Sequence, residues 1–136
     1  MTDAGLRLSE LGQVAQPVKD IARAVGFYRD VLGATHQATF DPPGLAFFDF
    51  GGVRLMLDAI GEAQGHGAPL YFRVPDIEAA CAALEARGVT IDSAPHLIQR
   101  DDAGVFGRPG METWMAFFKD PDANILAVMS EVVPGA

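Results

Sequence analysis

The amino-acid sequence predicts an α+β fold in which one domain, residues 1–136, contains two tandem βαβββ modules. The first observation is an internal repeat: residues 18–21 and 74–77 each open a helical pattern, and residues 45–48 and 115–118 each lead into a turn and a strand. The second is the alternation of apolar and polar residues, typical of strands, around these helices. The third is the chain length, which suits about one domain.

The first module is expected at about residues 10–60 and begins with a strand over 12–18. Asp20 is a good N-cap, because its carboxylate can accept hydrogen bonds from the free amides of the first helical turn. Apolar residues then fall on one helical face: Ile21, Val25, Tyr28 and Leu32. Gly33 suits the left-handed position that ends the helix. Three strands follow, over 35–40, 45–50 and 53–57, with turn residues at 41–44 and 51–52 between them.

A linker rich in glycine and proline is expected at about residues 61–69, before a second module at about 70–131. Its strand over 70–74 leads to the N-cap Asp76, and its helix ends at Gly88. The later strands are expected over 90–98, 113–118 and 125–129, with a turn at 120–124. Compared with the first module, this one carries an insertion near residues 99–110, whose glycines suit either a lid or an idle loop.

Composition excludes some classes of function. The formal net charge of -8 would repel the phosphate backbone of a nucleic acid, so no nucleic-acid partner is expected. No apolar run is long enough for a membrane span and no signal segment opens the chain, so we expect no membrane contact and a cytoplasmic location. The single cysteine, Cys81, lies among alanines in a helical pattern and is expected in the core rather than as a nucleophile.

Two motifs resemble those of a known superfamily. Asp20 and Ile21 followed by GFYRDVLG at residues 26–33, and FKDPDAN at residues 118–124, resemble signatures of the vicinal oxygen chelate superfamily. That superfamily includes glyoxalase I, bleomycin-resistance proteins and extradiol dioxygenases. The usual final motif has glycine where this chain has Ala123. The resemblance implies two half-barrels facing one another around a central cavity, commonly in a homodimer.

The resemblance also implies where a metal would bind in metal-dependent members, on the first and fourth strand of each module. The corresponding residues are Gln13, Leu55, Pro69 and Ala127. Only Gln13 could donate an oxygen, whereas a catalytic divalent metal needs about three protein ligands. We therefore expect no cofactor and no metal site. A divalent metal stays possible if a shifted alignment supplies other donors, such as His96, Glu112, Asp49 or Asp58.

Several polar and aromatic residues are candidates for the site. If side chains alternate along the first strand of module two as they do in the family, Tyr71 and Arg73 face the cavity. There Arg73 could bind an anionic group, or it could instead pair with an acidic neighbour such as Glu112. His96 could act as a base or be an ordinary packing residue. Trp114 could line the pocket or lie in the core. The candidate ligand-binding residues are Gln13, Tyr71, Arg73 and Trp114, and the catalytic candidates are His96, Glu112 and Tyr71.

These observations favour a homodimeric protein that binds a small, partly apolar organic molecule in its half-barrel cavity without the usual metal. One alternative is a metal-dependent lyase, isomerase or dioxygenase with substituted ligands. Another is a resistance protein that sequesters a drug, as the bleomycin-binding members do. Metal content and ligand titration would separate the three.

Overall fold

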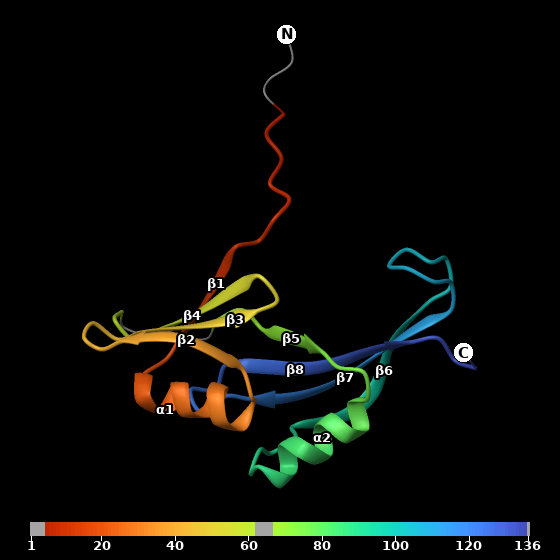
Figure 1. The fold of residues 1–136 in the computed structure, drawn as a ribbon. Coiled ribbons are helices and arrows are strands. Elements are labelled where there is room, and N and C mark those ends of the chain that lie inside the picture. The colour runs from red at the N-terminus through yellow and green to blue at the C-terminus, as the bar shows by residue number, and fades with distance from the viewer. Residues whose placement is uncertain (1–4, 62–66, 136) are drawn as a thin grey trace. The chain divides into compact units, whose positions relative to one another are not determined.

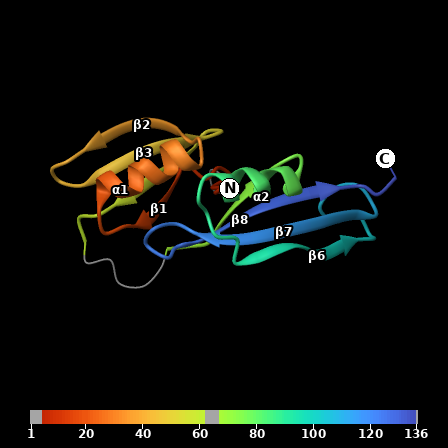
Figure 2. The same ribbon diagram turned by 90° about the horizontal axis from the view of Figure 1, so that it is seen from below.

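The computed structural model describes residues 5–61 and 67–135 and confirms the α+β fold with two tandem modules (Figure 1). The chain divides into two compact units, Met1–Gln64 and Gly65–Ala136. Each unit contains its own four-stranded sheet and its own helix, and Figure 2 shows the helix of each unit lying across its sheet. The middle of the predicted linker, residues 62–66, lies outside the described residues.

Module one follows the predicted order of elements. They are β1 (Gln13–Pro17), α1 (Ile21–Gly26), η1 (Phe27–Val31), β2 (Thr35–Phe40), β3 (Leu45–Phe50) and β4 (Val53–Asp58). The sheet order is β1-β4-β3-β2, with β1 parallel to β4 and the other neighbours antiparallel. The predicted strands over 35–40 and 45–50 coincide with β2 and β3.

The helix of module one differs from the prediction in its second half. Asp20 caps it as expected, because its Oδ1 accepts a hydrogen bond from the Arg23 amide at 3.0 Å. From Phe27 onward, however, the backbone forms a π-helical turn in which the Leu32 amide donates to the Phe27 carbonyl at 3.0 Å. The wider turn accommodates one more residue than an α-turn. Gly33 follows in the left-handed conformation, with φ of 73°.

Module two repeats the arrangement, and its last three strands are longer than their counterparts in module one. Its elements are β5 (Leu70–Arg73), α2 (Ile77–Ala86), β6 (Ser93–Asp101), β7 (Met111–Lys119) and β8 (Ile125–Val132). The sheet order is β5-β8-β7-β6, and β5 runs parallel to β8. Asp76 caps α2 by accepting from the Ala79 amide at 3.0 Å.

The insertion in module two lengthens the β6–β7 hairpin rather than adding a free loop. The predicted loop over 99–110 is therefore too long, since β6 continues to Asp101. The Asp101 carboxylate accepts from the amides of Val105 and Phe106, each at 2.8 Å. A side chain at Gly104, where φ is +74°, would come within 3.0 Å of the Gly107 carbonyl oxygen. Glycine at position 104 therefore allows the backbone of this turn to pack closely.

One face of each sheet is buried beneath its helix. In module one, Tyr28 packs on Phe48 with ring centroids 5.9 Å apart, and both side chains are fully buried. In module two, the helix residues Ile77, Cys81 and Leu84 are buried. We call the opposite face of each sheet the helix-free face. Among the described residues, no helix is long and apolar enough to cross a membrane.

The turn between β7 and β8 places Ala123, where the family motif usually has glycine, in a strained backbone conformation. Its φ is 66°, a left-handed conformation that glycine adopts without cost and alanine does not. Replacing Ala123 by glycine is expected to raise the free energy of unfolding by about 1 kcal/mol in urea denaturation. Ala82→Gly on the exposed side of α2 is the control, and should lower it by about 1 kcal/mol. A loss of stability in Ala123→Gly would show that the left-handed turn is not strained.

Cys81 is buried in α2, as predicted. Burial raises the pKa of its thiol, and the nearby Glu78 and Glu85 carboxylates raise it further. Because the thiolate is the reactive form, Cys81 should react with Ellman's reagent slowly at pH 7–8 and faster as the pH rises. The rate in denaturing urea is the reference. Equal rates in the native and unfolded protein would contradict this expectation.

Candidate functional site

The strand register of module two determines which side chains share its helix-free face. Tyr71 pairs with Ala127, which pairs with Phe117 on the next strand. Residues paired across neighbouring strands point to the same side of a sheet. These three positions therefore lie side by side on one face. The row beside them on this face consists of Arg73, Met129, Met115 and His96.

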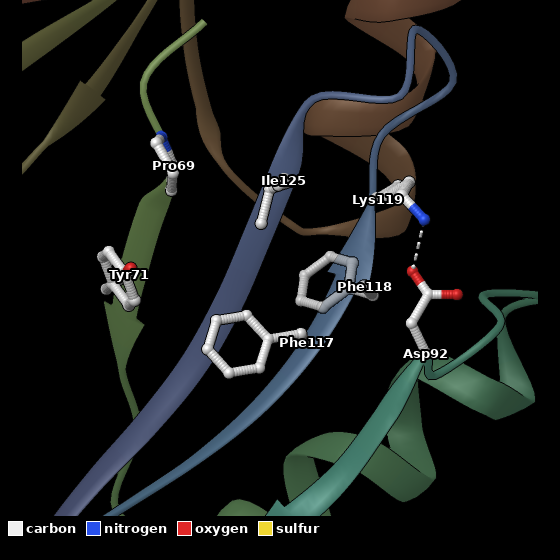
Figure 3. Close-up of a pocket in the computed structure, with 7 residues that line it drawn as sticks. All are labelled: Pro69, Tyr71, Asp92, Phe117, Phe118, Lys119 and Ile125. Carbon is white, nitrogen blue, oxygen red and sulfur yellow. Dashed lines mark hydrogen bonds and ion pairs between the residues drawn. The ribbon is translucent and has the colours of Figure 1, made fainter. Parts of the chain in front are cut away.

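A pocket of about 320 Å³ opens at one end of this face (Figure 3). The Tyr71 and Phe117 rings meet edge to face, with centroids 6.2 Å apart. Tyr71 is 49% exposed and Ile125 is 38% exposed, so both offer apolar surface to an incoming molecule. The residues that line the pocket are Pro69, Tyr71, Asp92, Phe117, Phe118, Lys119 and Ile125. An apolar pocket with few polar groups is the usual form of a small-molecule site.

The polar groups of the pocket lie at one end. The Lys119 ammonium is 3.2 Å from an Asp92 carboxylate oxygen, and both side chains are partly exposed (Figure 3). An exposed ion pair of this kind contributes little to stability. Its two groups can therefore exchange partners with a ligand's polar group at small cost. Tyr71 adds a hydroxyl that can donate or accept a hydrogen bond.

Arg73 lies on the helix-free face of module two but outside the pocket lining. Its Nε is 2.5 Å from Glu131 Oε1 on β8. The Arg73 side chain is 70% exposed, whereas that of Glu131 is 21% exposed. The acidic partner is therefore Glu131 rather than Glu112, because the residue two positions beyond Met129 shares its face.

His96 is brought to the same face as Tyr71 through contact with Phe117. The His96 and Phe117 ring centroids are 6.2 Å apart. His96 Nδ1 is 2.8 Å from the Ala94 carbonyl oxygen. A carbonyl can only accept, so Nδ1 carries the hydrogen and Nε2 keeps a lone pair. That nitrogen can accept a hydrogen bond or bind an electrophile.

Trp114 and Glu112 lie on the other side of the sheet, away from Tyr71. The Trp114 indole donates to Glu112 Oε1 at 3.1 Å. Trp114 helps to line a second pocket, of about 340 Å³, beside Ile77 of α2 and Ser130 of β8. The structure thus separates these two candidates from Tyr71, Arg73 and His96, because alternate residues of β7 face opposite ways.

Gln13 lies on the helix-free face of module one. Its amide nitrogen is 3.8 Å from Met56 Sδ, and its oxygen accepts from Arg54 Nη1 at 3.5 Å. Leu55, by contrast, is buried beneath the helix and pairs with Phe48. The choice of Leu55 as the fourth-strand position was therefore wrong by one residue. Met56 shares the face of Gln13 and is the counterpart of Ala127 in the repeat.

The residues at the implied metal positions do not fit a divalent ion. Pro69 and Ala127 carry no donor, and a thioether at Met56 is a soft ligand. Within residues 5–61 and 67–135, no three His, Cys, Asp or Glu side chains form a group that could hold a metal. Two of the substitutes serve turns instead: Asp49 accepts from the Gly52 amide at 3.1 Å and Asp58 from the Ile60 amide at 2.8 Å.

Sequence reasoning missed most of the pocket lining. Phe117, Lys119 and Ile125 were not among the candidates, although the predicted turn at 120–124 carried the necessary signal. A turn of that length pairs Lys119 with Ile125, and the alternation then places Phe117 beside Ala127. Asp92 carried no such signal, because its position depends on where β6 begins.

Comparison with known proteins agrees with this architecture. A family model described as Glyoxalase/Bleomycin resistance protein/Dioxygenase superfamily matches residues 10–128. The uncharacterized protein YraH of Bacillus subtilis is 26% identical over 133 residues, which cover 88% of this chain and 96% of YraH. An integron cassette protein from the mobile metagenome of V. cholerae superposes with a TM-score of 0.70 at 25% identity, covering 92% of this chain and 97% of the other. TnmS3, an antibiotic binding protein from Streptomyces sp. CB03234, superposes with a TM-score of 0.69 at 22% identity, covering 93% and 99%.

Proposed function

Because the chain belongs to the glyoxalase/bleomycin resistance protein/dioxygenase superfamily, we propose that it binds a small, partly apolar organic molecule on the helix-free face of module two. The observation that carries this proposal is the pocket in which Tyr71, Phe117 and Ile125 present apolar surface beside the Lys119–Asp92 ion pair. The molecule binds without the usual divalent metal of the superfamily.

The pocket suits a ligand with a flat apolar part and one polar group. The edge-to-face pair of Tyr71 and Phe117 leaves ring surface for stacking, and such contacts add to the burial of apolar area. The ligand's polar group meets Lys119 or Asp92 at the end of the pocket. Arg73 forms an ion pair with Glu131 and lies outside the pocket lining, so we do not expect it to contact the ligand.

Fluorescence titration with 8-anilinonaphthalene-1-sulfonate, an aromatic ring system bearing one anionic group, tests this site. Tyr71→Ala and Phe117→Ala are each expected to weaken binding about tenfold, because each removes one ring of the pair. Phe40→Ala is the matched control, since Phe40 is 53% exposed and makes an edge contact with Phe47 in module one. Circular dichroism must show that the variants fold. Unchanged affinity in both pocket variants would refute the proposal.

Drug sequestration is a second candidate, favoured by the structural likeness to an antibiotic binding protein. The net charge of -8 favours association with a cationic drug. Calorimetric titration with bleomycin, a cationic glycopeptide, tests this use of the site. Binding that Phe117→Ala weakens would support it, and no heat of binding would dismiss it.

The metal content of the purified protein distinguishes the proposed metal-free binding protein from the alternative, a metal-dependent lyase, isomerase or dioxygenase. Elemental analysis of the purified protein is expected to find no stoichiometric Zn, Ni, Mn or Fe, because only Gln13 offers a hard donor at the four implied positions. One equivalent of metal that Gln13→Ala removes would overturn the metal-free reading. The ligand titration above would remain valid in either case.

We also propose that the protein works as a cytoplasmic homodimer, as the family resemblance and the sequence imply. Sedimentation velocity tests the assembly, and a mass near twice 14.4 kDa is the expected result. A single monomeric species over the micromolar range would reject the dimer.

A further inference from the structure

Three side chains with soft or borderline donor atoms form a row on the helix-free face of module two. His96 on β6 pairs with Met115 on β7, and Met115 pairs with Met129 on β8. Directly paired residues of adjacent strands have Cβ atoms about 4.5–5.5 Å apart on the same side of the sheet. One imidazole and two thioethers are therefore neighbours across three strands.

His96 can supply one nitrogen donor to this row. Its Nδ1–H donates to the Ala94 carbonyl at 2.8 Å, which leaves the lone pair on Nε2. A backbone carbonyl that holds the second ring nitrogen is the usual arrangement behind a metal-binding histidine. The contact of the His96 ring with Phe117, a residue of the same face as Met115, places the ring on the correct side of the sheet.

The chemistry of the donors selects the kind of ion. Two thioethers and one neutral imidazole are soft to borderline and carry no charge, which suits Cu(I) rather than Zn²⁺ or Mg²⁺. Two charged residues lie beside the methionines on this face: Arg73, which pairs with Met129 in the register, and Glu131, two residues after Met129 on β8. These two form an ion pair, so their charges offset one another. A monovalent ion therefore meets little net repulsion.

We propose that His96, Met115 and Met129 form a binding site for a soft monovalent metal ion, Cu(I), with Nε2 and the two Sδ atoms as ligands. This site is separate from the implied divalent site, whose positions include Pro69 and Ala127. It neighbours the pocket of Tyr71 and Phe117 but does not depend on the proposed organic ligand, so either proposal can fail without the other.

Methyl NMR with Ag(I), a redox-inert soft ion, tests the ligand set directly. The chain has five methionines, so a sample labelled with ¹³C at the methionine methyl groups gives five assignable signals. One equivalent of Ag(I) is expected to shift the signals of Met115 and Met129. Those of Met56, which lies in module one beside Gln13, and Met111, which lies against Gly107, should stay in place. Shifts at other methionines, or none, would overturn the proposal.

Competition for Cu(I) against bicinchoninate under anaerobic, reducing conditions measures the affinity. Met115→Leu, Met129→Leu and His96→Gln are each expected to weaken binding by at least about tenfold, since each removes one ligand. Met56→Leu is the matched control, and Cys81→Ser should also bind as tightly as the parent, because the buried thiol is not a ligand. Full affinity in the Met115→Leu/Met129→Leu double variant, with normal folding by circular dichroism, would disprove the site.

Discussion

Replacing Asp120 by alanine is expected to lower the free energy of unfolding by about 3 kcal/mol or more. Asp120 is 5% exposed and its carboxylate holds the turn between β7 and β8. One oxygen accepts from the amides of Asp122 and Asn124, each at 2.9 Å, and the other accepts from the Asn124 side chain at 2.8 Å. Alanine would leave these donors without their acceptor inside the protein. Urea denaturation monitored by circular dichroism gives the difference.

The same network extends to the segment before β5. Asn124 is fully buried, and its side-chain oxygen accepts from the Gly67 amide at 2.9 Å. Loss of Asp120 therefore also disturbs the residue that ties this segment to the hairpin, and such coupling within a network adds to the cost. Asp102→Ala is the control, since Asp102 forms an exposed ion pair with Arg100 and should change stability by less than about 0.5 kcal/mol. A similarly small effect of Asp120→Ala would mean that water satisfies the freed donors.

The second large effect is expected at Gln16, where leucine should raise the free energy of unfolding by about 1–3 kcal/mol. Gln16 is fully buried on the helix-covered face of β1, paired with Leu57. Neither its amide nitrogen nor its amide oxygen has a hydrogen-bond partner among the described residues. Leucine has a similar volume and needs no partner, so it removes the cost of the buried amide without leaving a cavity. Thermal and urea denaturation measure the change.

Gln13→Leu is the matched control for this substitution, because Gln13 is an exposed glutamine of the same strand. Its side chain lies on the helix-free face, so leucine there gains no burial and should leave stability within about 0.5 kcal/mol of the parent. A destabilised Gln16→Leu protein would show that an internal water bridges the Gln16 amide in solution. The difference in the free energy of unfolding between the two variants then gives the contribution of that water to stability.

The sequence alone determined the order of the elements and, apart from the π-helical second half of the first helix, their kind, because these depend on local chemistry. The caps Asp20 and Asp76, and the left-handed glycines Gly33 and Gly88, act within a few residues of where they stand in the chain. The repeat then predicted two modules of the same order. The sequence also predicted the buried Cys81, since its neighbours leave one apolar helical face.

The tertiary structure decided which face of a strand a residue occupies wherever no local turn fixed the register. A shift of one residue moves a side chain to the opposite side of the sheet. The alignment of the two modules from sequence places Leu55 at the implied metal position, whereas in the structure Met56 shares the face of Gln13. The same rule separates Trp114 from Tyr71. In β6, irregular pairing between Ser93 and His96 breaks the simple alternation.

The ion pairs and the pocket also required the packed structure. Arg73 reaches Glu131 across a parallel pair of strands, and Lys119 reaches Asp92 between segments far apart in the chain. These ion pairs depend on strand register and on where the helix packs. The spacing of residues along the chain does not predict either of them. Local patterns specify hydrogen bonds and apolar faces along one segment, whereas a site is made by side chains that only the paired strands bring together.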